Sequence, residues 1–179
     1  MRFVQGVVVL FLAAVLIGCS SVPMSTLWQM RGFGPEDFLA INANELAARV
    51  SISEAYVPDF ESVGLNVRMT EGDQEWDERF ELNLVEQYPR TVPGGWFSAD
   101  REEMVYDLVL AEEAIDAFRR HQDVYRQFEP RQVAASVNMK FSEFPEDRDS
   151  AIISIELRLS QNDGYFPLIR EAVLEFKSE

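Results

Sequence analysis

Few residues in this chain of 179 could perform acid–base or nucleophilic chemistry, since it contains one histidine and one cysteine. His121 could serve as a general base only beside a nucleophile that it activates. The chain has no Gly-x-Ser-x-Gly sequence, the strand-to-helix turn that exposes a serine nucleophile in one large class of hydrolases. His121 also borders the apolar side of a predicted helix, so we expect a half-buried structural histidine.

Metal and carboxylate chemistry receives little support from the residue pattern. A zinc site needs clustered cysteine and histidine ligands, and the chain has one of each. The acidic stretches 71–78 and 146–149 lack the spacing of a calcium-binding EF-hand loop, so we expect solvated loop ends. We therefore predict no metal and no cofactor. A catalytic carboxylate pair cannot be recognised among 31 acidic residues, because its separation in space defines it.

The N-terminus carries the most specific pattern in the chain. Arg2 precedes an apolar run over residues 3–17, which is shorter than the roughly 20 residues of a spanning helix and typical of a secretory signal. The run ends in Leu16-Ile17-Gly18-Cys19, which resembles the lipobox of bacterial lipoproteins. The resemblance implies that residues 1–18 are a cleaved signal peptide and that Cys19 is lipidated.

The same resemblance implies a location and a domain organisation. Ser20 follows the cysteine, where an aspartate would imply retention in the inner membrane of many Gram-negative bacteria. We therefore expect a lipid anchor in the outer membrane, with the protein facing the periplasm; the inner membrane is the alternative. Residues 19–26 form a short tether, and residues 27–179 are enough for a single domain with its own core.

The charge of the chain limits its partners. Its formal net charge is −15, and loss of Arg2 with the signal peptide would make it −16. A surface of this charge argues against nucleic acid, whose phosphates it repels, but permits a cationic partner. Solubility in the periplasm is the simpler explanation of the acidity.

Alternation of apolar and polar residues predicts that most of the remaining chain forms β-strands with one buried face. The uniformly apolar segment 104–110 fits a central strand, and Asn162-Asp163-Gly164 favours a tight hairpin turn. About seven antiparallel strands are expected. The alternating segments are 46–53, 63–70, 79–84, 133–141, 153–159 and 168–176.

One long helix interrupts these strands. Over residues 111–128, apolar residues recur at helical spacing on one side and charged residues occupy the other. A short helix is also predicted to begin at Pro35. The predicted fold is mainly β, an antiparallel β-sandwich of about seven strands with this amphipathic helix inserted after strand four. An open sheet curled around the helix is the alternative.

Two segments carry aromatic residues that could contact a partner. Trp28, Phe33 and Phe38 lie in the apolar stretch 27–41, and Trp96 and Phe97 lie in the predicted loop 88–100. Aromatic residues are enriched in binding hot spots, and exposed apolar patches mark interaction sites. The alternative for both segments is that these side chains pack on the domain itself.

Together these features favour a non-catalytic scaffold or interaction lipoprotein, anchored in the membrane through Cys19 and bound to a protein partner in a cell-envelope assembly. The second hypothesis is a carrier of lipid or another hydrophobic ligand, which requires an apolar cavity between sheet and helix. A hydrolase of unknown substrate is the third. Beyond the N-terminus, no pattern in the sequence names a ligand or a partner.

Overall fold

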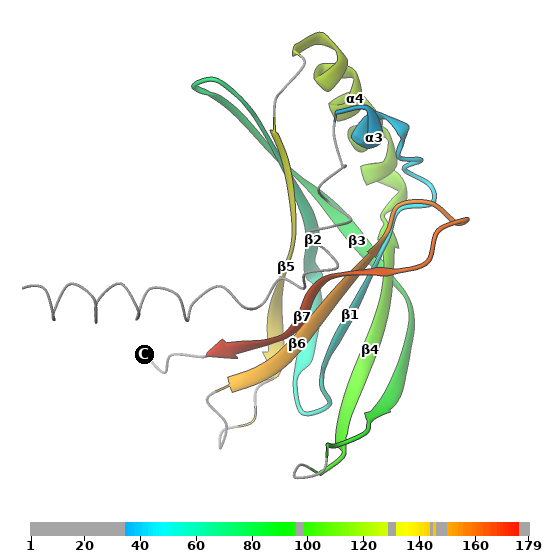
Figure 1. Ribbon diagram of the computed structural model, residues 1–179, viewed down its shortest axis with the longest axis vertical. Helices are drawn as coiled ribbons and strands as arrows, with labels where there is room; N and C mark the ends of the chain where they lie inside the picture. The colour runs from blue at the N-terminus through cyan, green and yellow to red at the C-terminus, as the bar shows by residue number, and fades with distance from the viewer. Residues whose placement is uncertain (1–34, 96–98, 129–131, 144, 146–149, 176–179) are drawn as a thin grey trace, which may run out of the picture.

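The computed structural model describes residues 35–95, 99–128, 132–143, 145 and 150–175. Within these residues, seven antiparallel strands and two helices confirm the mainly β class and the helix after the fourth strand (Figure 1). In chain order the elements are α3 (Pro35–Ala40), β1 (Ala47–Ser53), β2 (Val57–Glu71), β3 (Gln74–Val92), β4 (Arg101–Leu110), α4 (Glu112–Phe128), β5 (Gln132–Glu143), β6 (Ser150–Arg158) and β7 (Phe166–Glu175).

The strands join in one curled sheet, in the order β5-β2-β3-β4-β1-β6-β7, instead of the two separate sheets of a sandwich. The long strand β3 is the reason. Its first half pairs with β2, where Gly64 lies opposite Glu81, and its second half pairs with β4, where Leu82 lies opposite Leu110. Because β3 belongs to both halves, the sheet curls without separating. The alternative of an open curled sheet thus describes the strand arrangement.

The loop predicted over residues 88–100 is shorter in the structure, because β3 is longer than the sequence indicated. The strand continues to Val92, and β4 begins at Arg101. Pro89 and Pro93 indicated a loop, because proline cannot donate to a sheet ladder. However, the pairing of β2 with β3 stops at Glu81, so the second half of β3 has an unpaired side, and an edge tolerates Pro89.

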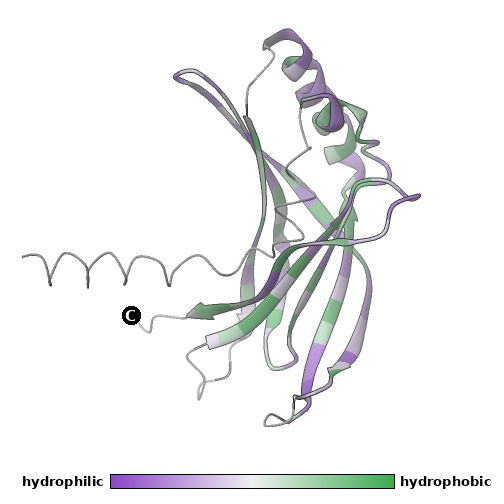
Figure 2. Cartoon of the chain, in the orientation of Figure 1, coloured by the Kyte–Doolittle hydropathy of each residue, from purple (hydrophilic) through white to green (hydrophobic). Residues whose placement is uncertain are grey.

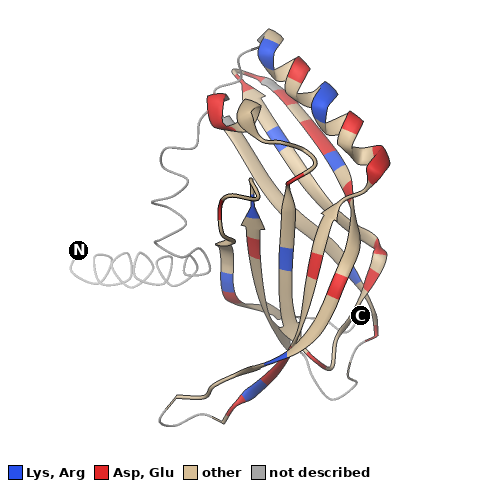
Figure 3. Cartoon of the chain, turned by 90° about the vertical axis from the view of Figure 1, so that its right-hand side faces the viewer, with Lys and Arg blue, Asp and Glu red and all other residues tan. Residues whose placement is uncertain are grey.

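The concave side of the sheet holds the hydrophobic core. Hydrophobic positions recur along the strands, as Figure 2 shows, and Val50 and Ile52 of the interior strand β1 are completely buried. Charged residues occupy the solvent side of α4 and positions along the strands (Figure 3). The alternation that predicted the strands therefore separates a buried concave face from a solvated one.

The two helices close one end of the curled sheet (Figure 1). The Phe118 ring of α4 lies 5.5 Å from the Phe38 ring of α3 and 5.1 Å from the Phe80 ring of β3. The buried Gln122 amide donates to the carbonyls of Phe38 and Ile41, at 2.9 and 3.0 Å. Phe38 belongs to α3 and Ile41 directly follows its last residue, so Gln122 fixes the C-terminal end of α3 on α4.

Candidate functional site

An apolar groove lies between β5 and β7, the two edge strands of the curled sheet. β5 contributes Val137, Met139 and Phe141, all of which are partly exposed. The groove is open to solvent and has a volume of about 780 Å³, a size typical of small-molecule sites. Its opposite wall comes from β6 and β7, through Ile153, Ile155, Ile169, Ala172 and Leu174.

The edge position of β5 explains why its apolar face stays accessible. Val137 and Met139 alternate with Ser136 and Asn138, so the two sets point to opposite faces of the strand. β5 pairs with β2 on one side and has no neighbouring strand in the sheet on the other. No further strand covers this side of β5, and the groove lies there.

The helix end of the concave side is filled instead. The rings of Phe38 and Tyr125 lie 5.1 Å apart there, and the remaining space is only about 40 Å³. Leu46, Phe118 and Phe166 are among the residues around it. A packed helix end and an accessible groove between β5 and β7 thus share one continuous apolar interior.

Polar residues reach the groove through a bulge in β2. Asp59 lies opposite Lys140 of β5, but the next pair is Gly64 with Asn138, so residues 60–63 lie opposite Met139 alone. The Ser62 hydroxyl donates to the Asp59 carbonyl and accepts the backbone N–H of Lys140, both at 2.7 Å. The bulge thereby brings Asp59, Glu61 and Ser62 to the groove.

Arg79 of β3 completes this polar rim. Its guanidinium donates to the Ser62 carbonyl at 2.6 Å, and its side chain crosses over Gly64. A Cβ atom at position 64 would lie 2.5 Å from Nε of Arg79, so a larger residue there would push the guanidinium aside. Neither Arg79 nor Lys140 takes part in the ion pairs that join described residues.

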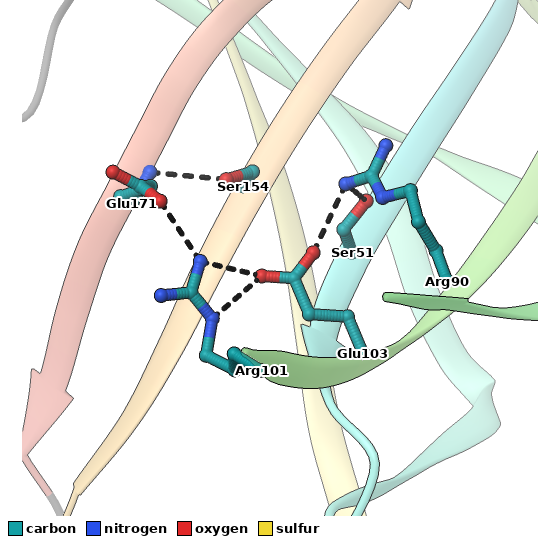
Figure 4. Close-up of polar contacts among 6 residues, drawn as sticks. All are labelled: Ser51, Arg90, Arg101, Glu103, Ser154 and Glu171. Atoms are coloured by element: carbon teal, nitrogen blue, oxygen red, sulfur yellow. Dashed lines mark hydrogen bonds and ion pairs between the residues drawn. The ribbon is translucent and has the colours of Figure 1, made fainter. Parts of the chain in front are cut away.

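A second polar cluster links strands of the other half of the sheet (Figure 4). Its centre is Glu103 of β4, which is only 2% exposed. The carboxylate accepts hydrogen bonds from Arg90 of β3 at 3.0 Å and from Arg101 of β4 at 2.8 and 3.0 Å. Arg90 also donates to the Ser51 hydroxyl of β1 at 2.9 Å. A buried carboxylate is thus held by two guanidinium groups, as a buried charge requires.

The same cluster extends to the edge strand β7. Arg101 donates to the Glu171 carboxylate at 2.8 Å, and this hydrogen bond raises the pKa of Arg101. Glu171 has a positive φ of 51°, and its backbone N–H donates to the Ser154 hydroxyl at 3.0 Å. Ser51 and Ser154 therefore both accept hydrogen bonds here, and neither is hydrogen-bonded to a histidine or carboxylate side chain of the described residues. The cluster is built to tie strands together.

His121 is buried in the core, more deeply than the half-buried position that the sequence predicted. Its ring lies 5.6 Å from the Phe80 ring and 6.4 Å from the Phe38 ring, edge to face with both. Burial lowers the pKa of His121, and the nearby Glu78 carboxylate opposes this shift only in part. The imidazole is therefore neutral at pH 7, and its Nε2 has no hydrogen-bond partner among the described residues.

The partner contacts predicted from sequence fall mostly outside the described residues, which exclude Cys19, Trp28, Phe33, Trp96 and Phe97. Phe38 is described and is 2% exposed, so it packs in the core and offers no surface to a partner. The groove and the Glu103 cluster were not predicted. The alternation in β5 was visible in the sequence, but it does not say which strand lies at an edge.

Among the described residues, no group of three or more His, Cys, Asp or Glu residues is placed to hold a metal ion. In the acidic stretch 71–78, Glu75 and Asp77 both pair with Arg68, at 2.9 and 2.7 Å. No described helix has the length and apolar character needed to cross a membrane.

Comparisons with protein-family models, with curated proteins and with solved structures find no match to this chain. The groove and its rim therefore have to be interpreted from their own chemistry.

Proposed function

We propose that this protein is a lipid-anchored, periplasm-facing binding protein that carries an apolar ligand in the groove between β5 and β7. The observation that supports the proposal is the groove itself, which has a volume of about 780 Å³ and has eight apolar side chains in its walls. Folded proteins normally fill such a space with their own side chains, and a well-formed apolar pocket is the usual form of a ligand site.

An apolar ligand would gain free energy from this groove in proportion to the surface it buries. Each methylene removed from water contributes about 0.8 kcal/mol, so a long acyl chain binds more tightly than a short one. The partly exposed Val137, Met139 and Phe141 would lose their own contact with water at the same time. The carrier hypothesis expected its cavity between sheet and helix; that space is filled, and the groove lies instead between the edge strands β5 and β7.

The proposed anchor would keep the groove close to a source of such ligands. Cys19 and Pro35 are separated by 15 residues, which span at most about 55 Å when fully extended. A protein tethered in this way samples the region next to the membrane surface. Lipids or other hydrophobic molecules leaving that surface are therefore the natural ligands.

The polar clusters favour binding over bond-breaking chemistry. The Glu103 carboxylate is occupied by Arg90 and Arg101, and His121 lies in the aromatic core. A general base has to reach the proton that it removes, and neither group is placed to do so on a molecule in the groove. The proposed role is accordingly non-catalytic.

Two neighbouring positions of β7 provide the test. Ala172 lines the groove, whereas Val173 is 61% exposed and points away from it, so Ala172→Trp fills the groove and Val173→Trp does not. Binding of the neutral fluorescent probe N-phenyl-1-naphthylamine is measured on both variants and on the parent protein. We expect Ala172→Trp to weaken binding at least tenfold and Val173→Trp to leave it unchanged. Equal binding by all three proteins would exclude the groove as the ligand site.

A scaffold role for the same anchored protein is the second candidate, and the edge strand β5 favours it. Residues 133–139 of β5 contain no charge and no proline, the two features that normally protect a sheet edge from pairing with another chain. β7, the other edge, has Pro167 and a bulge at Glu171.

The partner of such a scaffold would be an extended segment of an envelope protein that adds to β5. Purification from native envelopes in mild detergent tests this. A stoichiometric protein partner that is lost in Ser136→Pro, and retained in the groove-filling Ala172→Trp, would favour the scaffold over the carrier. Co-purified lipid without a protein partner would favour the carrier.

A further inference from the structure

We infer that residues 27–34, the apolar segment between the proposed tether and α3, occupy the groove between β5 and β7 until a ligand displaces them. The inference rests on the proposed function and adds a regulation of the same site. Its support comes from the place of α3 along the groove, and from the length and composition of the segment that precedes α3.

The open groove continues the space that α3 already covers. On β5, Ala135 lines the filled part at the helix end and Val137 lines the open part. On β6, Leu157 lines the filled part and Ile155 lines the open part. Phe38 of α3 lines the filled part only, so the cover that α3 provides stops where the open groove begins.

The residues before α3 continue its apolar composition. Within the described part of this stretch, Phe38 is buried, and Leu39 and Ile41 pack against the core. Residues 27–34 contain a single charge, Arg31, and four large apolar residues, Leu27, Trp28, Met30 and Phe33. In water these side chains would form an exposed apolar patch, whereas the groove offers them an apolar surface next to α3.

The segment is long enough to cover the open groove. Its eight residues span at most about 28 Å when extended. The six-residue step along β5 from Ala135 to Phe141, at the far end of the groove, covers about 20 Å. Pro35 is one helical turn before Phe38, about 4.5 Å along the axis of α3. The segment can therefore start at α3 and still reach Phe141.

The covalent connection to α3 favours this segment over a separate molecule. A short connection holds the segment at the groove at an effective concentration on the order of a millimolar. Its one charge is positive, so the net charge of −15 attracts it. A ligand binds only the fraction of molecules in which the groove is free, so the segment lowers its apparent affinity by that fraction.

Probe binding tests the competition. The protein is the full mature chain with Cys19→Ser, so that no acyl chain of its own competes. Trp28→Ser with Phe33→Ser removes two large apolar side chains from the segment, so N-phenyl-1-naphthylamine should bind at least threefold more tightly. Gln29→Ser is the matched control, because a polar side chain gains little from an apolar groove, and it should leave the affinity unchanged. Circular dichroism checks that each variant is folded.

Cross-linking tests where the segment lies. Cys19 is the only cysteine of the chain, so Cys19→Ser gives a parent protein without cysteine. Met30→Cys is combined either with Ala172→Cys, in the groove, or with Val173→Cys, on the exposed face. A short bismaleimide should link position 30 to position 172 at least tenfold faster than to position 173, and saturating probe should slow the first link severalfold. A segment outside the groove would instead favour the more exposed position 173.

The outcomes separate this inference from the carrier itself. Equal linking at positions 172 and 173, or a probe affinity that stays the same or falls in Trp28→Ser with Phe33→Ser, would overturn the inference. If Ala172→Trp still weakens probe binding in that case, the carrier stands without a competing segment. Preferred linking to position 172 in a protein that never binds the probe, with or without the serine replacements, would support occupation by the segment and contradict the carrier.

Discussion

At the scale of single residues, Glu103 is the most constrained charge among the described residues. A carboxylate that is 2% exposed is tolerated only because Arg90 and Arg101 both donate to it. The Arg101 guanidinium then continues to Glu171, whose side chain is 56% exposed. Glu103 is therefore removed from water and Glu171 is not. The ion pairs of Glu103 should contribute more to stability than the ion pair of Glu171.

Glu103→Gln is expected to lower the free energy of unfolding by about 1–3 kcal/mol, because it leaves the partly buried Arg90 without a counterion and Arg101 with Glu171 alone. Glu171→Gln, the matched control at the exposed end, should cost under about 1 kcal/mol. Denaturant unfolding of both variants measures the difference. Equal costs would show that burial of Glu103 does not govern the strength of the cluster.

His121 predicts a pH dependence of stability. Burial lowers its pKa in the folded state below the unfolded value of about 6.5, so the unfolded chain binds the proton more readily. Stability from this residue is therefore complete above about pH 7 and is lost as the pH falls through 6.5 toward the folded pKa. His121→Phe should show a smaller loss of stability between pH 7.5 and 5.5 than the parent protein.

Glu78→Gln should change the pH dependence in the direction opposite to His121→Phe. The Glu78 carboxylate raises the pKa of His121, so its removal should lower that pKa further and steepen the pH dependence. Chemical unfolding at the two pH values tests both variants. The same slope in the parent protein, His121→Phe and Glu78→Gln would mean that other groups cause it.

At the scale of elements, the contact of α4 with the sheet rests on a small aromatic cluster. Phe118 packs between Phe38 and Phe80, and Gln122 holds the C-terminal carbonyls of α3. The helix could be predicted because its apolar positions recur every three to four residues. The surface that it covers could not, since Phe38 and Phe80 are distant from it in the sequence.

Phe118→Ala should lower the free energy of unfolding by about 3–5 kcal/mol, the usual cost of emptying a buried aromatic position. Val85→Ala is the control, because Val85 is 64% exposed at the irregularity of β3 and should change stability by under about 0.5 kcal/mol. Thermal or denaturant unfolding measures both. A small effect of Phe118→Ala would mean that α4 contributes little to the stability of the sheet.

At the scale of the whole molecule, the proposed anchor and the groove have to act together. Cys19→Ala should release the protein from the membrane fraction of a Gram-negative host and abolish labelling with palmitate, because the acyl chains supply the membrane affinity. Ser20→Asp, by contrast, should keep the label and move the protein to the inner-membrane fraction. Membrane attachment that survives Cys19→Ala would contradict lipidation of this residue.

The sequence alone determined the local features of this protein. Alternation predicted the strands that the structure places at β1, β5 and β6, and helical spacing predicted α4 almost to the residue. These signals are local, because burial of one face repeats every two residues in a strand and every 3.6 in a helix. The lipobox resemblance is local in the same way, and it remains a prediction.

Only the tertiary structure decided the curl of the sheet, the edges and the groove. Alternation is identical in a sandwich and in a curled sheet, and it was the pairing of β3 with both β2 and β4 that selected the second. Edge strands arise from the strand order, which brings Met139 and Ala172 into one groove although they are far apart in the chain. Glu103 and its arginines were hidden among many charges for the same reason: pairing across strands, and not spacing along them, brings such groups together.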